Sequence, residues 1–225
     1  MFHRIFLTAL VAGAIAGVCL FVAHLTITTP LILQAEVYEN AAPDQTPGSA
    51  PASEDMTAGN VQRSLYSLMA DLVTSMGFAF LLVGAIALSG QNVDWRRGLV
   101  WGLCGYASFS LAPTFGLAPE LPGMLSTALQ ERQVWWAATV AATAGGLALI
   151  FLVERPAIKW IGPVLIVLPH LIGVPEHEIY SGDVPAALAA EFAVATLVIG
   201  GLYWVLLGGL AGYFYDRFER DLPGR

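Results

Sequence analysis

"AIKWIGPVLIVLPHLIG" (Ala157–Gly173) decides how many times this chain crosses a membrane. The stretch is strongly apolar, yet Pro163 and Pro169 interrupt it. A helix rises about 1.5 Å per residue, and about 20 apolar residues are needed to cross the bilayer core. The stretch is slightly shorter than this length. It therefore either forms a short transmembrane helix or enters the membrane and returns to the same side.

The composition establishes that lipid is the main solvent of the chain. Of its 225 residues, 56% are hydrophobic and 12% are charged, about half the charged fraction of soluble domains. Five further apolar segments are each long enough to cross a bilayer, at about 5–28, 65–88, 98–118, 133–153 and 187–213. We expect an all-α, polytopic integral membrane helix bundle with about six transmembrane helices, the fifth short and proline-interrupted. It forms a single transmembrane domain over residues 1–225.

A polar segment divides the first two spans. "NAAPDQTPGSAPASEDMTAGN" (Asn40–Asn60) is rich in proline, alanine and serine and has little to bury. Such a composition is typical of a flexible linker. We expect residues 40–60 to form one on the outer side of the membrane.

The basic residues predict the orientation. If six segments cross, only Arg63 and Arg132 lie on one side, and the other eight basic residues lie on the opposite side. The positive-inside rule then predicts that both termini are cytoplasmic. The outer surface becomes acidic, and Glu36 and Glu39 are among the carboxylates exposed there. Such a surface suits the collection of cations.

Glycines occur at four-residue spacing in three of the spans. The pairs are Gly13/Gly17, Gly98/Gly102 and Gly208/Gly212. In lipid, where hydrophobic burial no longer drives association, such pairs let helix backbones approach closely. They predict a tightly packed bundle.

Ionisable residues within the apolar segments are the first candidates for a functional site. His24 lies near the outer end of the first span, Asp71 lies in the second, and Glu191 begins the sixth. An aspartate at the centre of a membrane helix costs about 2.5–3.5 kcal/mol on insertion scales, so such residues usually have a function. Asp71 and Glu191 are also close enough to helix ends to reach water or cap a helix, and both interpretations stay open.

A second group of candidates follows Pro169. His170 lies at the outer interface, and His177 follows in the next loop between Glu176 and Glu178. Pro169 removes a backbone donor and frees a carbonyl about one turn earlier, as in the broken helices of transporters. Neutral imidazoles, carboxylates and free carbonyls together suit a borderline divalent cation. The candidate transport-site ligands are His170, His24, Glu191, Asp71, His177, Glu36 and Glu39.

Several function classes are excluded. The net charge of −7 and the lack of a basic patch argue against a nucleic-acid partner. The chain has no G-x-S-x-G, H-E-x-x-H or nucleotide-binding motif, so we expect neither an enzyme nor an ATPase. We expect no tightly bound cofactor.

Four stretches in order resemble one family. They are "PLILQAEVYE" (Pro30–Glu39), "VDWRRGLVWGLCGYASFSLAPTFGLAPELPG" (Val93–Gly123), "RQVWWAATVAATAGGLAL" (Arg132–Leu149) and "LPHLIGVP" (Leu168–Pro175). Together they resemble the CbtA family, membrane subunits of a bacterial cobalt transporter. The resemblance extends over nearly the whole chain except the linker.

The resemblance implies a function and a partner. It implies uptake of a cobalt ion for cobalamin synthesis across the inner membrane of a bacterium. The implied partner is a small one-span CbtB-type subunit with a histidine-containing tail. The family has about five spans, so five and six both stay open, and the residues do not separate cobalt from nickel.

Two other functions fit the same sequence. His24 and His170, at similar depths on two helices, would suit the axial ligands of a haem in a membrane electron-transfer protein. The chain would also suit an assembly subunit that conducts nothing itself.

Overall fold

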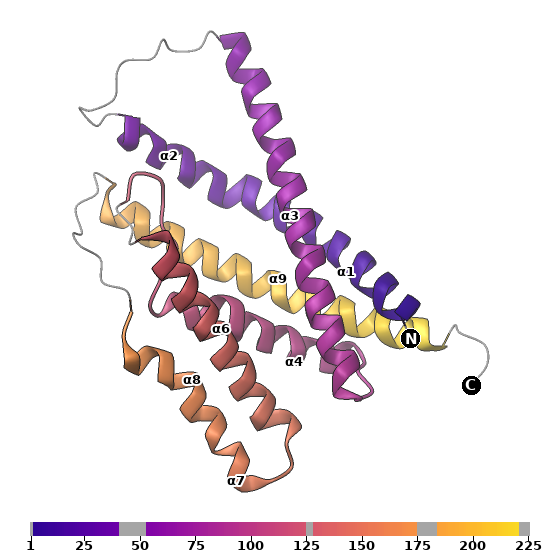
Figure 1. Cartoon of the computed structure of the whole chain (residues 1–225). Coiled ribbons are helices and arrows are strands. Elements are labelled where there is room, and N and C mark those ends of the chain that lie inside the picture. The colour runs from indigo at the N-terminus through magenta and orange to yellow at the C-terminus, as the bar shows by residue number, and fades with distance from the viewer. Residues whose placement is uncertain (1, 41–52, 125–127, 175–183, 221–225) are drawn as a thin grey trace.

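A computed structural model describes residues 2–40, 53–124, 128–174 and 184–220, without the side chains of 39–40 and 53–60. Within these ranges the chain is helical apart from short connections and contains no strand. The expected helical membrane bundle is confirmed. The elements are α1 (Phe2–Ala23), η1 (His24–Thr28), α2 (Thr29–Asn40), α3 (Ser53–Ser89), α4 (Trp95–Tyr106), η2 (Ala107–Leu111), α5 (Ala112–Thr114), α6 (Leu129–Leu152), α7 (Pro156–Lys159), α8 (Ile161–Ile172) and α9 (Ala186–Arg220) (Figure 1).

Four helices among the described residues are long and apolar enough to cross a membrane. They run over Phe2–Tyr38, Val61–Ser89, Leu129–Leu152 and Ala186–Arg220. These correspond to four of the six predicted spans. The third predicted span forms the continuous helix of α4, η2 and α5. Its first turn contains the charged residues Arg96 and Arg97, so this helix is less apolar than the other four.

The proline-interrupted stretch forms α7 and α8, and α8 runs antiparallel to α6 (Figure 1). At one end of this pair, a Cβ added to Gly162 would lie 2.6 Å from the carbonyl oxygen of Gly146, so the backbones touch. At the other end, Trp135 Nε1 donates a hydrogen bond to the carbonyl oxygen of Gly173 at 2.8 Å. The segment thus runs along α6 in the opposite direction and ends beside the start of α6. Within the described residues it does not re-enter the side from which it came.

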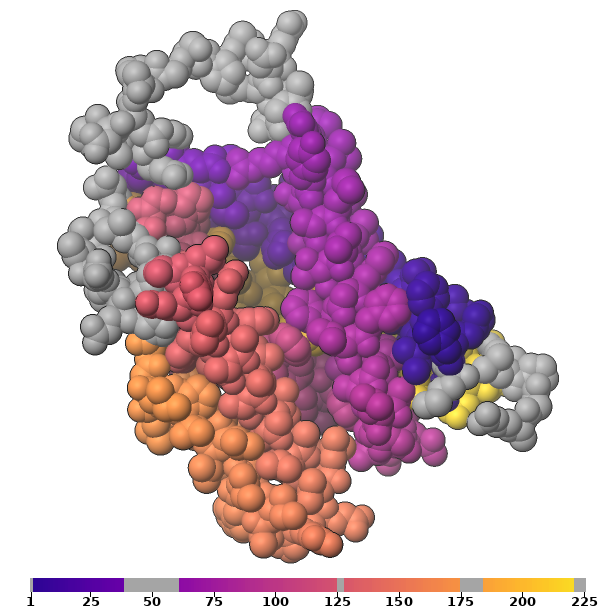
Figure 2. Space-filling model, viewed as in Figure 1, coloured from indigo at the N-terminus to yellow at the C-terminus, as the bar shows by residue number. Residues whose placement is uncertain are grey.

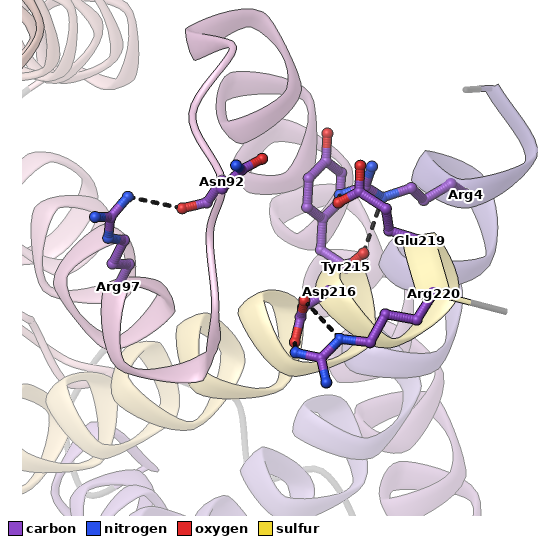
Figure 3. A network of polar contacts seen from close by, with 7 residues as sticks. All are labelled: Arg4, Asn92, Arg97, Tyr215, Asp216, Glu219 and Arg220. Atoms are coloured by element: carbon purple, nitrogen blue, oxygen red, sulfur yellow. Dashed lines mark hydrogen bonds and ion pairs between the residues drawn. The ribbon is translucent and has the colours of Figure 1, made fainter. Parts of the chain in front are cut away.

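Both ends of the described chain meet at one end of the bundle, which we call the terminal end. The guanidinium of Arg4 on α1 forms an ion pair with Glu219 on α9 at 3.0 Å. Its Nε donates to the carbonyl oxygen of Tyr215 at 2.8 Å, and its Cζ lies 3.5 Å from the centroid of that ring (Figure 3). Arg97, near the start of α4, donates to the carbonyl oxygen of Asn92 (Figure 3). An even number of membrane crossings would place both ends of the chain on the same side of the membrane, in agreement with this position. We call the opposite end, where α9 begins, the far end.

The predicted glycine pairs lie where helix backbones approach closely. A Cβ added to Gly98 would lie 2.9 Å from the Cα of Gly212, and one added to Gly208 would lie 2.6 Å from the Cα of Gly102. A Cβ added to Gly13 would lie 2.8 Å from the Cα of Met76 on α3. Separations below 3 Å leave no room for a side chain. The prediction that these glycines pack backbone on backbone is confirmed.

One predicted boundary differs. Helix α2 ends at Asn40 and α3 begins at Ser53, so residue 40 and residues 53–60, predicted as part of the linker, are helical. The remainder of the predicted linker, residues 41–52, lies outside the described residues. Helix α3 extends well beyond the apolar segment that starts near residue 65. Residues 53–60 are polar, so the apolar pattern did not predict that they are helical.

Candidate functional site

The imidazole of His24 and the carboxylate of Asp71 meet between the first two long helices. His24 Nδ1 lies 3.1 Å from Asp71 Oδ1 and 3.2 Å from Oδ2. The side chain of Asp71 is only 14% exposed, and that of His24 is 35% exposed. The capping interpretation of Asp71 is wrong, because the helix that carries it begins at Ser53.

The backbone at His24 is unusual. His24 begins the π-helical turn η1, and a second π-helical turn, η2, lies between α4 and α5. Pro30 follows the end of η1 by two residues, and Pro113 follows the end of η2 by two residues. Proline lacks the N–H that an α-helix needs and its ring clashes with the carbonyl four residues earlier, so the preceding turn widens. Such single π turns are frequent at functional sites.

A line of polar groups continues from Asp71. Ser75, one helical turn further along α3, donates a hydrogen bond from Oγ to the carbonyl oxygen of Gly13 at 2.8 Å. The hydroxyl of Tyr203 on α9 donates to Ser75 Oγ at 3.2 Å, and both residues are buried. Ser75 and Tyr203 were not among the predicted site residues. The four-residue spacing of Asp71 and Ser75, which places both on one face of a helix, was the available signal.

A cavity of about 280 Å³ lies beside this polar line. His24 and Tyr203 line it, together with Ser110 of η2, Thr114 of α5 and Thr196 of α9. The hydroxyl oxygen of Thr196 is buried and has no hydrogen-bond partner within the described part of the chain. Figure 2 shows a hollow on this face between α3 and α6, with α9 at its base. The cavity therefore offers one imidazole and several hydroxyl oxygens to a solute.

His170, the other described histidine of the predicted site, has different surroundings. Its ring packs edge-on against Trp135 and Phe115, with centroid separations of 5.7 and 6.2 Å. Pro169 beside it is buried. His170 is not among the residues that line the cavity of His24. The structure therefore does not bring the two predicted ligands to one cavity.

The predicted carboxylates are also separate. Glu36 forms two hydrogen bonds with the guanidinium of Arg63, at 2.6 and 3.2 Å. Glu191 is exposed and borders an apolar groove between η1 and α9 that Ile27 and Val194 help to line. The side chain of Glu39 and the whole of His177 lie outside what the structure describes.

The geometry restricts what the site can bind. Across the described residues, no group of three or more histidine, cysteine, aspartate or glutamate side chains is close enough to hold a metal ion. The His24–Asp71 pair has another property. When a carboxylate accepts a hydrogen bond from Nδ1–H of an imidazole, it fixes the ring and makes Nε2 the free ligand atom. The pair thus presents a single oriented nitrogen rather than a closed cage.

Comparison with known proteins identifies the family. Searches of curated proteins and of solved structures gave no match. Residues 2–216 match a family described as "probable cobalt transporter subunit (CbtA)". The match extends over the bundle, the polar line and the cavity, and it makes the chain a multi-pass membrane protein of transporter type. This chain belongs to the CbtA family.

Proposed function

We propose that the chain carries a divalent cobalt ion into the cell, and that His24 Nε2 is the nitrogen ligand of the ion during passage. Asp71 orients the imidazole and supplies negative charge. The single observation that carries this proposal is the contact between His24 Nδ1 and the Asp71 carboxylate at 3.1 Å, beside a cavity in an otherwise apolar bundle. A carboxylate within a membrane bundle raises the free energy of the folded protein, and a bound cation would offset this cost.

The ligand types suit the ion. Imidazole nitrogen is a good ligand for first-row divalent metals, and carboxylate and hydroxyl oxygens complete a mixed set. Ser110 and Thr196 supply hydroxyl oxygens to the same cavity. A site with one nitrogen and several weak oxygens holds an ion loosely, as a conducting path requires. The same set would also admit nickel.

The orientation follows from the basic residues and the shared position of the termini. We propose that the terminal end is cytoplasmic, that the protein lies in the inner membrane, and that the cavity receives ions from outside. An impermeant thiol reagent applied to intact cells should modify a cysteine at Leu117, at the far end, and spare one at Gln91, in the turn before α4. The opposite labelling pattern would reverse the orientation.

The remaining predicted ligands stay proposals for the outer mouth. Glu36 is paired with Arg63, which reduces its capacity to attract a cation. His170, His177, Glu39 and Glu191 stay predictions for ion collection before the ion reaches His24. The haem interpretation requires His24 and His170 at one cofactor, whereas their described contacts are with Asp71 and with Trp135 and Phe115.

A transporter subunit implies a partner. We propose the small one-span CbtB-type subunit, seated in the apolar groove of about 480 Å³ beside Glu191. An exposed carboxylate in lipid is costly, and a basic group on a neighbouring helix would offset that cost. Glu191→Lys should therefore abolish co-purification of the two subunits, and unchanged co-purification would reject this docking surface.

Replacing Asp71 by asparagine tests the proposed function. Loss of an orienting carboxylate behind a metal-binding imidazole typically reduces affinity by about 10- to 100-fold. We therefore expect the cobalt concentration for half-maximal uptake to rise by about that factor, measured with radioactive cobalt in cells producing both subunits. The matched control is Asp216→Asn, which removes a carboxylate paired with Arg220 at the terminal end. Equal uptake by Asp71→Asn and wild type, at equal membrane abundance, would contradict the proposal.

A further inference from the structure

The cavity of His24 ends against three packed aromatic rings. Phe78 of α3 lies 5.1 Å from Phe109 of η2 and 5.1 Å from Trp204 of α9, measured between ring centroids. Phe109 and Trp204 are stacked at 5.5 Å with an interplanar angle of 17°. All three line the cavity. We call these residues the aromatic layer.

The aromatic layer lies on the terminal side of the cavity. On α9 the lining residues run from Thr196 at the far end to Trp204, which is the last of them. On the α4–α5 helix, which runs the opposite way, Phe109 is the first lining residue, and the others continue toward Leu117. Phe78 lies about two turns closer to the terminal end than Asp71 on α3. An ion that passes His24 toward the cytoplasm would therefore meet these rings next.

Behind the aromatic layer the bundle is closed. Leu207, one turn beyond Trp204, is 0% exposed, as are Val83 on α3 and Ala211 on α9. The backbones of Gly102 and Gly208 touch in the same region. Side chains without exposed surface and backbones in contact are expected to leave no water-sized path through this part of the described bundle. The layer thus separates the cavity from a dry core.

Phe109 is the ring most suited to move. It contacts Phe78, Trp204 and also Trp136 of α6, at 6.2 Å, so it joins three helices. It lies within the π turn η2, which contains one residue more than an α turn. Migration or loss of that extra residue rotates the neighbouring side chains by about 100° around the helix axis. Such a rotation would take Phe109 out of the layer.

The packing around Trp204 fixes the closed arrangement. A Cβ added to Gly105 would overlap the indole of Trp204, with the ring atom Cη2 at 3.0 Å. Because Gly105 has no side chain, the indole of Trp204 packs directly against the backbone of α4. This contact holds Trp204 in the plane where Phe109 stacks on it.

We propose that Phe78, Phe109 and Trp204 form the inner gate of the cavity, and that the π turn η2 moves Phe109 to open it. Apolar constrictions close pores by excluding water, which a cation cannot cross without its hydration. The identity of the passing ion rests on the proposed function. The seal itself is a property of the packing, and it is tested without cobalt.

Cysteine accessibility tests the gate. In protein whose Cys19 and Cys104 are replaced by alanine, Leu207→Cys reports from behind the layer and Leu117→Cys reports from its far side. An impermeant thiol reagent is applied to membrane vesicles from the side that modifies Leu117→Cys. We expect Leu207→Cys to be unreactive with the layer intact, and to become reactive, more slowly than Leu117→Cys, once Phe109→Ala is added.

Matched variants separate a gate from general loosening. Phe109→Tyr keeps a ring and should keep Leu207→Cys protected, and Phe115→Ala, which removes an exposed ring outside the layer, should do the same. Trp204→Ala should expose the reporter as Phe109→Ala does. Modification of Leu207→Cys with the layer intact, or protection in both alanine variants at normal membrane abundance, would overturn the gate. Neither result depends on whether the Asp71 variant transports cobalt.

Discussion

Replacing His24 by glutamine is expected to abolish cobalt accumulation. Glutamine keeps most of the volume of the side chain and a hydrogen-bonding group, but its amide is a poor nitrogen donor. His24 is the only imidazole that lines the described cavity, so no other described histidine there can replace it. The measurement is accumulation of radioactive cobalt at equal membrane abundance of the variant and the wild type.

The matched control for this experiment is His170→Gln. His170 packs edge-on against the aromatic rings of Trp135 and Phe115, and its replacement should leave more uptake than His24→Gln does. Full loss in His170→Gln together with normal uptake in His24→Gln would move the ligand to α8. From the sequence alone, the position of His170 beside Pro169 predicts a metal ligand on α8.

The second large effect is expected where α4 crosses α9. Gly208→Leu should prevent the bundle from assembling, and Gly208→Ala should lower its stability by about 1–3 kcal/mol, because an added Cβ would meet backbone atoms of Gly102 at 2.6 and 2.7 Å. Backbone cannot yield as a side chain can. The measurement is the fraction of extracted protein that stays monodisperse after heating.

The neighbouring glycine provides the control for the crossing. A Cβ added to Gly209 would meet only a terminal methyl of Leu99, at 3.1 Å. Gly209→Ala should therefore cost much less than Gly208→Ala, although both changes are one residue apart on the same helix. Equal loss of stability in the two variants would mean that helix propensity, not the crossing, dominates.

The fold was largely predictable because lipid imposes simple rules. Apolar length predicted the long helices, and the glycine spacing predicted close backbone packing at those glycines, although not that Gly98 would meet Gly212. The start of α3 at Ser53 was not predictable from apolarity, because a helix that extends beyond the membrane carries polar residues.

The site was predictable only as a set of single residues. His24 and Asp71 were identified because each is an ionisable group in an apolar segment. Their pairing depends on how α1 and α3 are rotated against each other. The spacing of Gly13 and Gly17 indicates the packed face of α1, but not that α3 is the helix packed there or which face α3 presents. Ser75 and Tyr203 were missed for a different reason. Hydroxyl groups are common in membrane helices, and only the packing shows that these two meet.

The most direct test of the central claim is the X-ray absorption spectrum of cobalt bound to the purified complex of the two subunits. We expect the multiple-scattering signature of an imidazole ring at cobalt, surrounded otherwise by oxygen ligands. We expect His24→Gln to remove this signature and His170→Gln to retain it. A cobalt shell without an imidazole in the wild type, or an imidazole signature that survives His24→Gln, would contradict the account.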